Sequence, residues 1–201
     1  MKTPIQFFFD FSSPYGYFAA MSIDELAKRY DRQVDWHPIL LGVIFKTTES
    51  KSLVDFPLKG PYSRHDMVRT ARLHQIDFKI PTVFPISTHQ AARAMLWLQQ
   101  QCGSAVAKQF AKKICQAFFV DNINISESDA VLKIVTQCGL DSQEVASGMA
   151  QPDIKDQLKA DNDAAIAKGI FGAPFIIADG EPFWGFDRFY QIEALLKNGE
   201  I

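Results

Sequence analysis

The sequence is poor in cysteine, with Cys102, Cys115 and Cys138 as its only thiols among 201 residues. They are odd in number, widely spaced and form no C-x-x-C pair, so a disulfide framework and a zinc site are not expected. Each lies in a helical pattern, where we expect a small buried apolar side chain. No metal-ligand spacing connects the four histidines, which are His37, His65, His74 and His89.

Long apolar runs and an excess of one charge are also missing. No run approaches the length of a membrane span, and the N-terminus has no leader-like pattern. A formal net charge of -2 and a pI near 6.1 argue against nucleic acid or an anionic membrane surface as the main partner. We therefore expect a soluble protein retained in the cytoplasm. An apolar content of 47% suffices for one domain, or for one domain that carries a large insertion.

The most informative segment is Phe-Phe-Phe-Asp-Phe-Ser-Ser-Pro-Tyr, at positions 7–15. It predicts a buried strand that runs directly into a helix. Pro14 suits the first helical position, and Ser13 before it is a natural N-cap. The Ser13 hydroxyl should therefore lie beside unpaired backbone N–H groups and the positive end of a helix dipole, where a thiolate or another anion is stabilised. By itself the motif favours an ordinary helix cap over an anion site.

The first 42 residues predict a βαβ unit. Residues 5–9 form an apolar run typical of a strand buried on both faces, residues 14–30 have helical periodicity, and residues 33–41 predict a second strand. A right-handed crossover makes these two strands parallel.

The middle of the chain, residues 43–168, predicts helices only. Helical periodicity is found in residues 66–74, 88–101, 106–119, 126–138 and 153–168. Ser126 and Asp141 each begin a pattern with an acidic first turn, which indicates a helix start. Residues 80–87, with Pro81 and Pro85, predict an irregular connection.

Strand character returns at residues 174–178, and Asp179-Gly180 predicts a hairpin turn to a partner strand at 183–184. Gly185 should end that strand, and Asp187 should cap a last helix that extends to Leu196. The order is therefore βαβ, a helical block, and ββα.

This order resembles the α/β thioredoxin fold, with residues 1–42 and 169–201 as its two halves and residues 43–168 as a helical insertion domain. An insertion of this kind resembles the DsbA-like superfamily. The resemblance implies that chemistry occurs where Ser13 faces Pro174. A cis peptide bond between Ala173 and Pro174, which costs little before a proline, would turn the Ala173 backbone toward the helix start. Since residues 13–16 read Ser-Pro-Tyr-Gly instead of C-x-x-C, dithiol exchange is excluded there.

Three motifs carry a closer resemblance. They are Asp-Phe-x-Ser-Pro-Tyr at 10–15, Phe-Gly-x-Pro at 171–174 and Phe-Trp-Gly-x-Asp-Arg at 183–188. They are similar to motifs of the 2-hydroxychromene-2-carboxylate isomerase family, which is close to the kappa-class glutathione transferases. Weaker matches are residues 59–62, Asp66 with Arg69 and Ala71, and Phe84-Pro85. The matches span the chain from one end to the other.

The resemblance implies glutathione as cofactor, with Ser13 as the catalytic residue that holds its sulfur as thiolate. Ser12 suits this role less, because it does not directly precede the helical proline. The backbone of Ala173, next to Pro174, would pair with the cysteinyl part of glutathione, and Asp187 would meet its ammonium group. Trp184, Gly185 and Phe186 would shape the same pocket, or else serve only as core and turn. Asp10 is expected to serve structure, and Arg188 to pair with an acidic neighbour.

The family reaction opens and closes a hydroxychromene ring, and so interconverts the hydroxychromene and a benzylidene-pyruvate. In it the thiolate adds to a conjugated double bond, permits rotation and is eliminated. The family tends to carry an Asn, often with a Pro, in the loop that corresponds to residues 45–51. This chain has neither residue there, so the sequence does not determine the identity of the substrate. Candidate cations for a substrate carboxylate, which could equally be solvated surface charges, are Lys46, Lys51, Lys59 and Arg64.

Three interpretations follow. The first is a glutathione-dependent isomerase of small aromatic or conjugated keto acids. The second is a kappa-like glutathione transferase or peroxidase, which consumes glutathione. The third is a non-enzymatic DsbA-like binding module. The relatives also suggest a homodimer that forms through the helical insertion.

Overall fold

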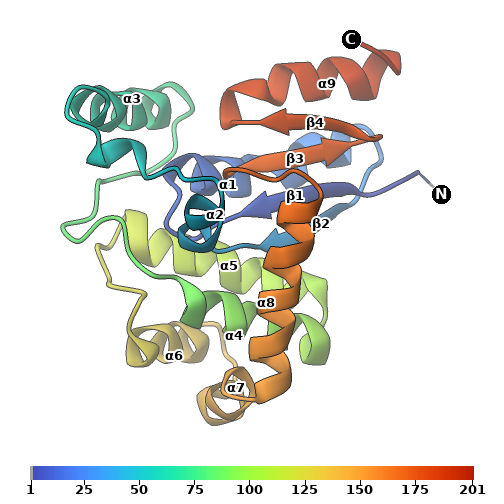
Figure 1. Ribbon diagram of the computed structural model, residues 1–201. Coiled ribbons are helices and arrows are strands. Elements are labelled where there is room, and N and C mark those ends of the chain that lie inside the picture. Colours follow the sequence, from blue (N-terminus) through green and yellow to red (C-terminus); the bar gives the residue numbers. More distant parts are fainter. Residues whose placement is uncertain (1) are drawn as a thin grey trace.

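A four-stranded mixed sheet organises the computed structural model, which describes residues 2–201 (Figure 1). The strands are β1 (Ile5–Phe9), β2 (Val34–Pro38), β3 (Phe175–Ala178) and β4 (Glu181–Trp184), in the order β2-β1-β3-β4. β1 pairs with β2 in parallel and with β3 antiparallel, and β3 pairs antiparallel with β4. The predicted βαβ and ββα halves are therefore confirmed, and they meet at β1 and β3.

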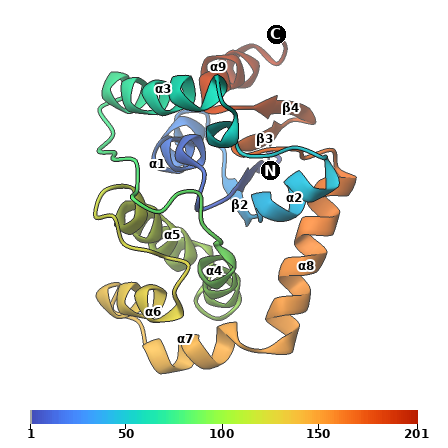
Figure 2. The ribbon, with the colours of Figure 1, turned by 60° about the vertical axis from the view of Figure 1, so that its left-hand side comes forward.

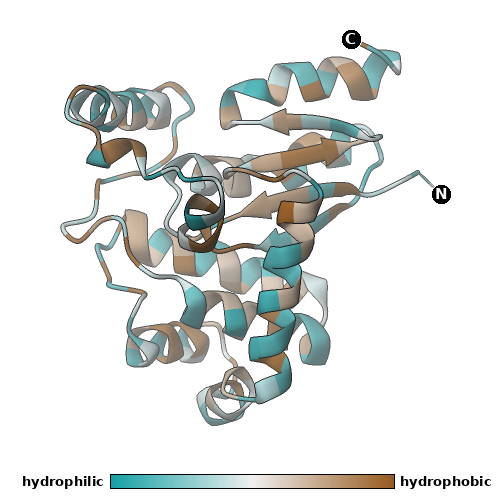
Figure 3. Ribbon diagram, viewed as in Figure 1, coloured by the Kyte–Doolittle hydropathy of each residue, from teal (hydrophilic) through white to brown (hydrophobic). Residues whose placement is uncertain are grey.

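The three consecutive phenylalanines of β1 divide between the two faces of the sheet, because side chains alternate along a strand. Phe7 and Phe9 belong to a large buried cluster, whereas Phe8 belongs to a smaller one. Phe7 pairs in register with Trp36 on β2 and with Ile176 on β3. Both faces of β1 are thus buried, which explains its nearly continuous apolar run (Figure 3).

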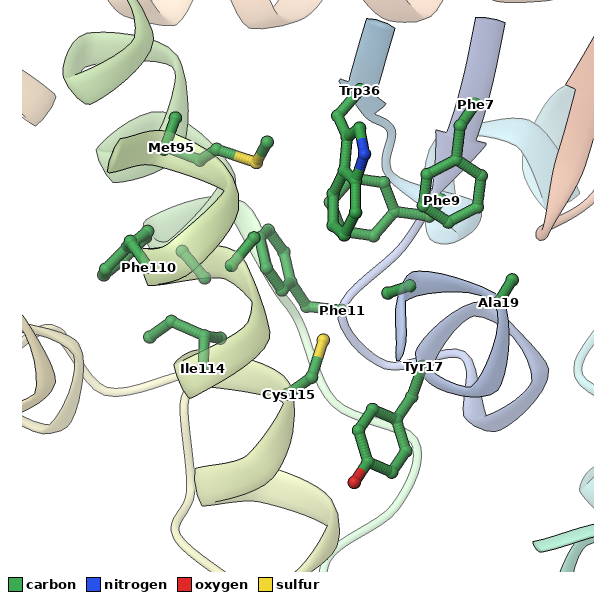
Figure 4. Close-up of a cluster of buried hydrophobic side chains, with 14 of the residues drawn as sticks. Phe7, Phe9, Phe11, Tyr17, Ala19, Trp36, Met95, Phe110, Ile114 and Cys115 are labelled. Carbon is green, nitrogen blue, oxygen red and sulfur yellow. The ribbon is translucent and has the colours of Figure 1, made fainter. Parts of the chain in front are cut away.

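The large cluster is formed where α1 (Pro14–Arg29), α4 (His89–Cys102), α5 (Ser104–Phe119) and α9 (Phe189–Asn198) meet the sheet. Figure 4 shows its centre, where side chains of β1 and β2 face those of α1, α4 and α5. The Trp36 ring lies edge-on to Phe7 and to Phe9, with ring centroids 5.1 and 5.3 Å apart. This arrangement is favourable for aromatic pairs beyond the area that they bury.

The smaller cluster lies on the opposite face, under α2 (Leu41–Thr47) and α8 (Pro152–Ala167). α2 and α8 lie side by side in both views (Figures 1 and 2). Apolar side chains of both helices pack against Phe8 and Phe175, among them Ile44 and Ala165. The remaining elements are α3 (Lys59–Leu73), α6 (Ser128–Gln137), α7 (Ser142–Met149) and the 3-10 turns η1 (Leu53–Asp55) and η2 (Phe186–Arg188).

The helices expected in the middle of the chain are present, with differences at some of their ends and with two additional elements. α3 begins at Lys59 instead of residue 66, and α6 begins two residues after Ser126. α2 and η1 are additional elements that periodicity did not reveal, because each is too short to show a repeat. Asp141 caps α7 as predicted, since its carboxylate accepts from the backbone N–H groups of Gln143 and Glu144.

Two expectations are wrong. Asp187 does not cap the last helix, because it lies inside η2, and Arg188 precedes the first residue of α9. Gly185, with a φ of 111°, turns the chain into this 3-10 turn before the α-helix begins. Cys102 is exposed at the end of α4 and Cys138 is only half-buried, whereas Cys115 is buried as expected.

The division into residues 1–42 with 169–201 and an insertion at 43–168 stays a prediction. α4 and α5, from the middle of the chain, share one buried cluster with β1 and α1. Within residues 2–201 we find no helix with the length and apolar character that crossing a bilayer requires.

Candidate active site

Ser13 lies at the junction between β1 and α1, where the fold brings distant segments together. Its Oγ accepts a hydrogen bond from the backbone N–H of Gly16 at 3.0 Å, so it caps α1 as the Ser-Pro motif predicts. The same hydroxyl donates to the backbone oxygen of Ala173, also at 3.0 Å. Ser13 is 5% exposed. The structure therefore places a buried hydroxyl at the positive end of a 16-residue helix, in contact with the segment before β3.

The Ala173–Pro174 peptide bond is cis. The Pro174 oxygen accepts from the backbone N–H of Gly185 at 3.0 Å, which joins this segment to the end of β4. These hydrogen bonds connect residues from opposite ends of the chain, namely Ser13, Ala173, Pro174 and Gly185.

Asp10 organises the surroundings of Ser13. One of its carboxylate oxygens accepts from the Ser12 backbone N–H at 2.7 Å and from the Thr88 hydroxyl at 3.0 Å. The other accepts from the backbone N–H of Leu41 at 2.6 Å. Burial raises the pKa of Asp10, and the three hydrogen bonds act in the opposite direction. One buried carboxylate therefore holds together the approach to α1, the start of α2 and the start of α4.

Ser12 has a different role from Ser13. Its Oγ accepts from the backbone N–H of Ile86 at 3.1 Å, which fixes the irregular segment before α4. The Phe84–Pro85 peptide bond in this segment is also cis, which the sequence analysis did not anticipate. The Ser12 hydroxyl thus has a structural role, because it fixes the position of the segment before α4.

A further contact joins α3 to the first turn of α1. The hydroxyl of Tyr15 donates to the carboxylate of Asp66, which also accepts from the Arg69 guanidinium at 2.8 Å. Burial and the bond to Asp66 raise the pKa of Tyr15. These contacts give a structural reason for the weak motif at Asp66 and Arg69, because they join α3 to the first turn of α1.

A cavity of about 720 Å³ opens beside Ser13. Its walls come from α2 and the following loop, from η1, from Met67 of α3, from the segment before α4 and from Ala173. Apolar lining residues are Pro14, Leu40, Leu41, Val43, Phe45, Leu53, Met67, Phe84, Pro85, Ile86 and Ala173. A concave, mostly apolar site of this size that touches a few polar groups is typical for a small molecule.

The remaining predicted site residues lie on the β4 side of Ala173 and do not line this cavity. Trp184 is 53% exposed and packs against Phe171, with ring centroids 5.0 Å apart. Phe186 is buried, with its ring 4.6 Å from that of His74. The Asp187 side chain is 72% exposed, and its carboxylate lies 3.4 Å from the Arg188 guanidinium. Phe186 is therefore a core residue, whereas Trp184 and Asp187 present accessible surface.

The candidate cations separate into two groups. Lys46 and Lys51 line the cavity, whereas Lys59 and Arg64 do not. The Lys59 ammonium lies 5.3 Å from the centroid of the Phe56 ring, and Arg64 borders a separate hollow beside η1. Among residues 2–201, no three His, Cys, Asp or Glu side chains are placed to hold a metal ion together.

The sequence analysis missed the connecting role of Asp10 and the walls that Leu53, Met67 and Phe84 contribute. No local pattern indicates that these side chains share a cavity, because they come from elements that meet only in the folded chain. The position of Asp10 could have indicated this role, since a carboxylate directly after a buried strand needs hydrogen-bond partners.

Comparison with known proteins agrees with this geometry. The model of the DSBA-like thioredoxin domain family matches residues 4–197. The chain is 24% identical to a 2-hydroxychromene-2-carboxylate isomerase of Sphingobium xenophagum, covering 98% of this chain and 99% of the relative. It is also 24% identical to glutathione S-transferase kappa 2 of Caenorhabditis elegans, covering 96% and 91% of the two chains.

Among solved structures, a 2-hydroxychromene-2-carboxylate isomerase superposes with a TM-score of 0.86 at 20% identity, covering 97% of this chain and 95% of the other. The family model matches nearly the whole length of the chain, and the mixed sheet and the helices agree with that match. The chain belongs to the family of DSBA-like thioredoxin domains.

Proposed function

We propose that this protein is a glutathione-dependent isomerase of 2-hydroxychromene-2-carboxylate or a related aromatic or conjugated keto acid. One observation carries the proposal: the Ser13 hydroxyl lies at the N-terminus of α1, contacts the Ala173 oxygen and borders a mostly apolar cavity. The similarity to 2-hydroxychromene-2-carboxylate isomerases over nearly the whole chain supports this choice of reaction.

In this proposal Ser13 is the catalytic residue and binds the sulfur of glutathione as thiolate. Its hydroxyl hydrogen, which now points to the Ala173 oxygen, would turn to the sulfur when glutathione binds. A hydrogen bond to a charged group contributes about 1.5–3 kcal/mol. The thiol pKa would therefore fall by about one to two units from its ordinary value near 8.5.

The peptide part of glutathione would lie along Ala173 and Pro174. Once the Ser13 hydroxyl turns away, the Ala173 oxygen is free to accept from the cysteinyl N–H of glutathione. The side chains of Trp184 and Asp187 and the backbone of Gly185 and Phe186 would form the far wall of this site. The exposed carboxylate of Asp187 is suited to the glutathione ammonium group.

The thiolate would then act as a borrowed nucleophile toward a substrate in the cavity. A bond forms between sulfur and a carbon of the conjugated system, while the carbon–carbon π bond breaks and its electron pair moves to the keto oxygen as an enolate. The former double bond becomes free to rotate. Elimination breaks the same sulfur–carbon bond and restores the thiolate, so glutathione is regenerated. The apolar walls would hold the aromatic part of the substrate.

A kappa-like glutathione transferase is the second candidate, supported by the relative of that name. Both candidates use the same thiolate at Ser13, and they differ in whether glutathione is consumed. An isomerase leaves the glutathione concentration unchanged during turnover, whereas a transferase lowers it in step with product.

The test is titration of glutathione binding with thiolate absorbance over a range of pH, for the wild type and for Ser13→Ala. Ser22→Ala is the matched control, because Ser22 lies on the same helix and donates to Phe18. We expect the lowered thiol pKa in the wild type and in the control, and its loss in Ser13→Ala. A pKa equal to that of free glutathione in all three proteins contradicts the proposal.

A further inference from the structure

The side of α3 that points away from the protein combines cationic and apolar side chains. Gly60, Ser63, Met67 and Ala71 are buried at a spacing of three to four residues, so they mark the side of the helix that packs on the fold. Residues on the opposite side, together with the one directly before the helix, are exposed: Leu58, Tyr62, His65, Arg69, Arg72 and Leu73. We call this set the outer face of α3.

The apolar side chains of the outer face are among the most exposed in the molecule. Leu58 is 89% exposed, Leu73 78% and Tyr62 61%. Large apolar side chains that gather on one surface mark a place where a partner or a membrane binds. Leu58 and Leu73 lie at opposite ends of the 15-residue helix, so the apolar surface extends along its whole length.

The same helix carries an excess of positive charge. Residues 58–73 contain four basic side chains and one acidic side chain, whereas the whole chain has a formal net charge of -2. Among residues 2–201, no ion pair engages Lys59, Arg64 or Arg72. The net charge of the protein therefore conceals a local cationic surface.

A chain of hydrogen bonds fixes the outer face relative to the core. Tyr15 of α1 donates to Asp66, which accepts from the Arg69 Nε at 2.8 Å. The Arg69 guanidinium also donates to the Tyr62 hydroxyl at 2.6 Å. Asp66 is the single carboxylate of α3, and these contacts engage it. Tyr62 and Arg69 are thus held in place, and the other cations of the helix keep their charge.

Shape and charge together favour an anionic lipid surface as the occupant of the outer face. α3 lies at the periphery of the molecule in both views, so its outer face is convex and suits a flat surface (Figures 1 and 2). Anionic headgroups attract basic side chains, while leucine side chains enter the apolar boundary and tyrosine suits the headgroup level. A nucleic acid would satisfy the cations only and leave the leucines in water.

A second copy of the chain fits the outer face less well. A twofold contact of this face with itself would bring the arginines of both copies into one interface. The single carboxylate of α3, that of Asp66, is already engaged by Tyr15 and Arg69. The like charges in such an interface would therefore meet without acidic partners from this helix.

We infer that the outer face of α3 binds reversibly to membranes that contain anionic lipids, with Lys59 and Arg72 beside the headgroups and Leu58 and Leu73 at the apolar boundary. The inference goes beyond the proposed function and does not depend on it. Met67, on the opposite side of α3, lines the cavity beside Ser13. Docking would therefore bring that cavity close to the lipid surface.

The first test measures sedimentation of the protein with vesicles of phosphatidylcholine alone and of an equal mixture with phosphatidylglycerol. We expect the wild type to bind the mixed vesicles, more weakly at high salt, and not the neutral ones. The variant Lys59→Gln with Arg72→Gln should bind the mixed vesicles about tenfold more weakly. The control Lys133→Gln with Lys155→Gln makes the same charge change at exposed positions of α6 and α8 and should match the wild type.

The second test removes the apolar contribution and leaves the charge unchanged. Leu58→Gln together with Leu73→Gln should weaken binding to the mixed vesicles about tenfold. Val83→Gln is the control, because Val83 is also exposed, at 57%, and lies outside α3. It should bind within twofold of the wild type. Thermal unfolding checks that all variants are folded.

Four results would overturn the inference. The first two are a wild type that does not bind the mixed vesicles, and one that binds neutral vesicles equally well. The third is an unchanged affinity in either α3 variant. The fourth is a wild type that is dimeric by light scattering and becomes monomeric on Leu58→Gln with Leu73→Gln, since the outer face is then a subunit interface. Duplex DNA is tested in parallel, and binding to it without binding to vesicles would also show that the inference is wrong.

Discussion

The buried carboxylate of Asp10 accepts a hydrogen bond from the hydroxyl of Thr88, which lies 78 residues later in the chain. The same carboxylate accepts from the Leu41 backbone N–H at 2.6 Å. Two walls of the cavity, one at α2 and one at α4, are therefore fixed relative to Ser13 through a single side chain. This dependence leads to the first prediction.

Asp10→Asn should lower the free energy of unfolding by about 3 kcal/mol, because the amide presents an N–H group to one of the three donors and leaves it unpaired. Thr88→Val removes only one hydrogen bond and should cost about 1 kcal/mol. Urea unfolding of both variants gives the comparison. A smaller effect of Asp10→Asn than of Thr88→Val would show that Asp10 does not connect these walls.

Ser13→Cys should create a thiol with a pKa below 8.5, because the new sulfur lies at the N-terminus of α1. Thiolate absorbance against pH measures this value. Native Cys102 provides an internal reference, since it is an exposed thiol. The introduced thiol should therefore react with iodoacetamide at pH 7 about tenfold faster than Cys102. Equal rates at the two positions would argue against an electropositive Ser13 site.

The ion pair of Arg32 with Asp179 should make stability depend on acid pH. The hydrogen bond from Arg32 holds the pKa of Asp179 below its usual value. A lowered folded-state pKa contributes stability above about pH 3.9, the unfolded value, and this contribution is lost as the pH falls through the folded value. Asp179→Asn should therefore cost about 1 kcal/mol at pH 7 and progressively less below pH 4.

Unfolding in urea at several pH values tests this dependence. Asn keeps the left-handed backbone that Asp179 adopts, with a φ of 51°, so the turn itself should persist. Asp31→Asn is the control, because Asp31 has a similar φ of 55° and no ion pair among residues 2–201. A pH-independent cost of Asp179→Asn would be inconsistent with a charge effect.

Gly60→Ala should destabilise the wall formed by α3 and η1. A Cβ at Gly60 would lie 2.6 Å from the backbone oxygen of Val54, and a backbone atom cannot move aside cheaply. We expect a loss of about 1–3 kcal/mol. Gly42→Ala in α2 is the matched control, because a Cβ there meets nothing within 4 Å and should stabilise the helix by up to about 1 kcal/mol. Thermal unfolding that shows equal effects would contradict this assignment.

Sequence patterns predicted those parts of the fold that depend on neighbouring residues. The Ser13-Pro14 helix start, the Asp179-Gly180 turn and the Asp141 cap each depend on local backbone chemistry, and the structure confirms them. The cap expected at Asp187 is wrong because the chain forms a 3-10 turn there, with the same residue types in a different hydrogen-bond pattern.

The candidate site could be located from the sequence only in part. Ser13 and Ala173 stood out because each lies beside a proline in a recognisable motif, and the structure brings them into contact. The cavity walls at Leu53, Met67 and Phe84 carry no such mark, since their proximity results from tertiary packing. The separation of Lys46 and Lys51 from Lys59 and Arg64 likewise required the folded arrangement.

The aromatic cluster around Trp36 also limits how far this protein can be shortened. A compact derivative that keeps only the sheet with α1 and α9 would expose the surfaces of Phe7, Phe9 and Trp36 that α4 and α5 now cover. Such a derivative would aggregate unless polar substitutions replaced that surface. Attempts to change the specificity of this protein should therefore alter the loops around Ser13 and keep α4 and α5 intact.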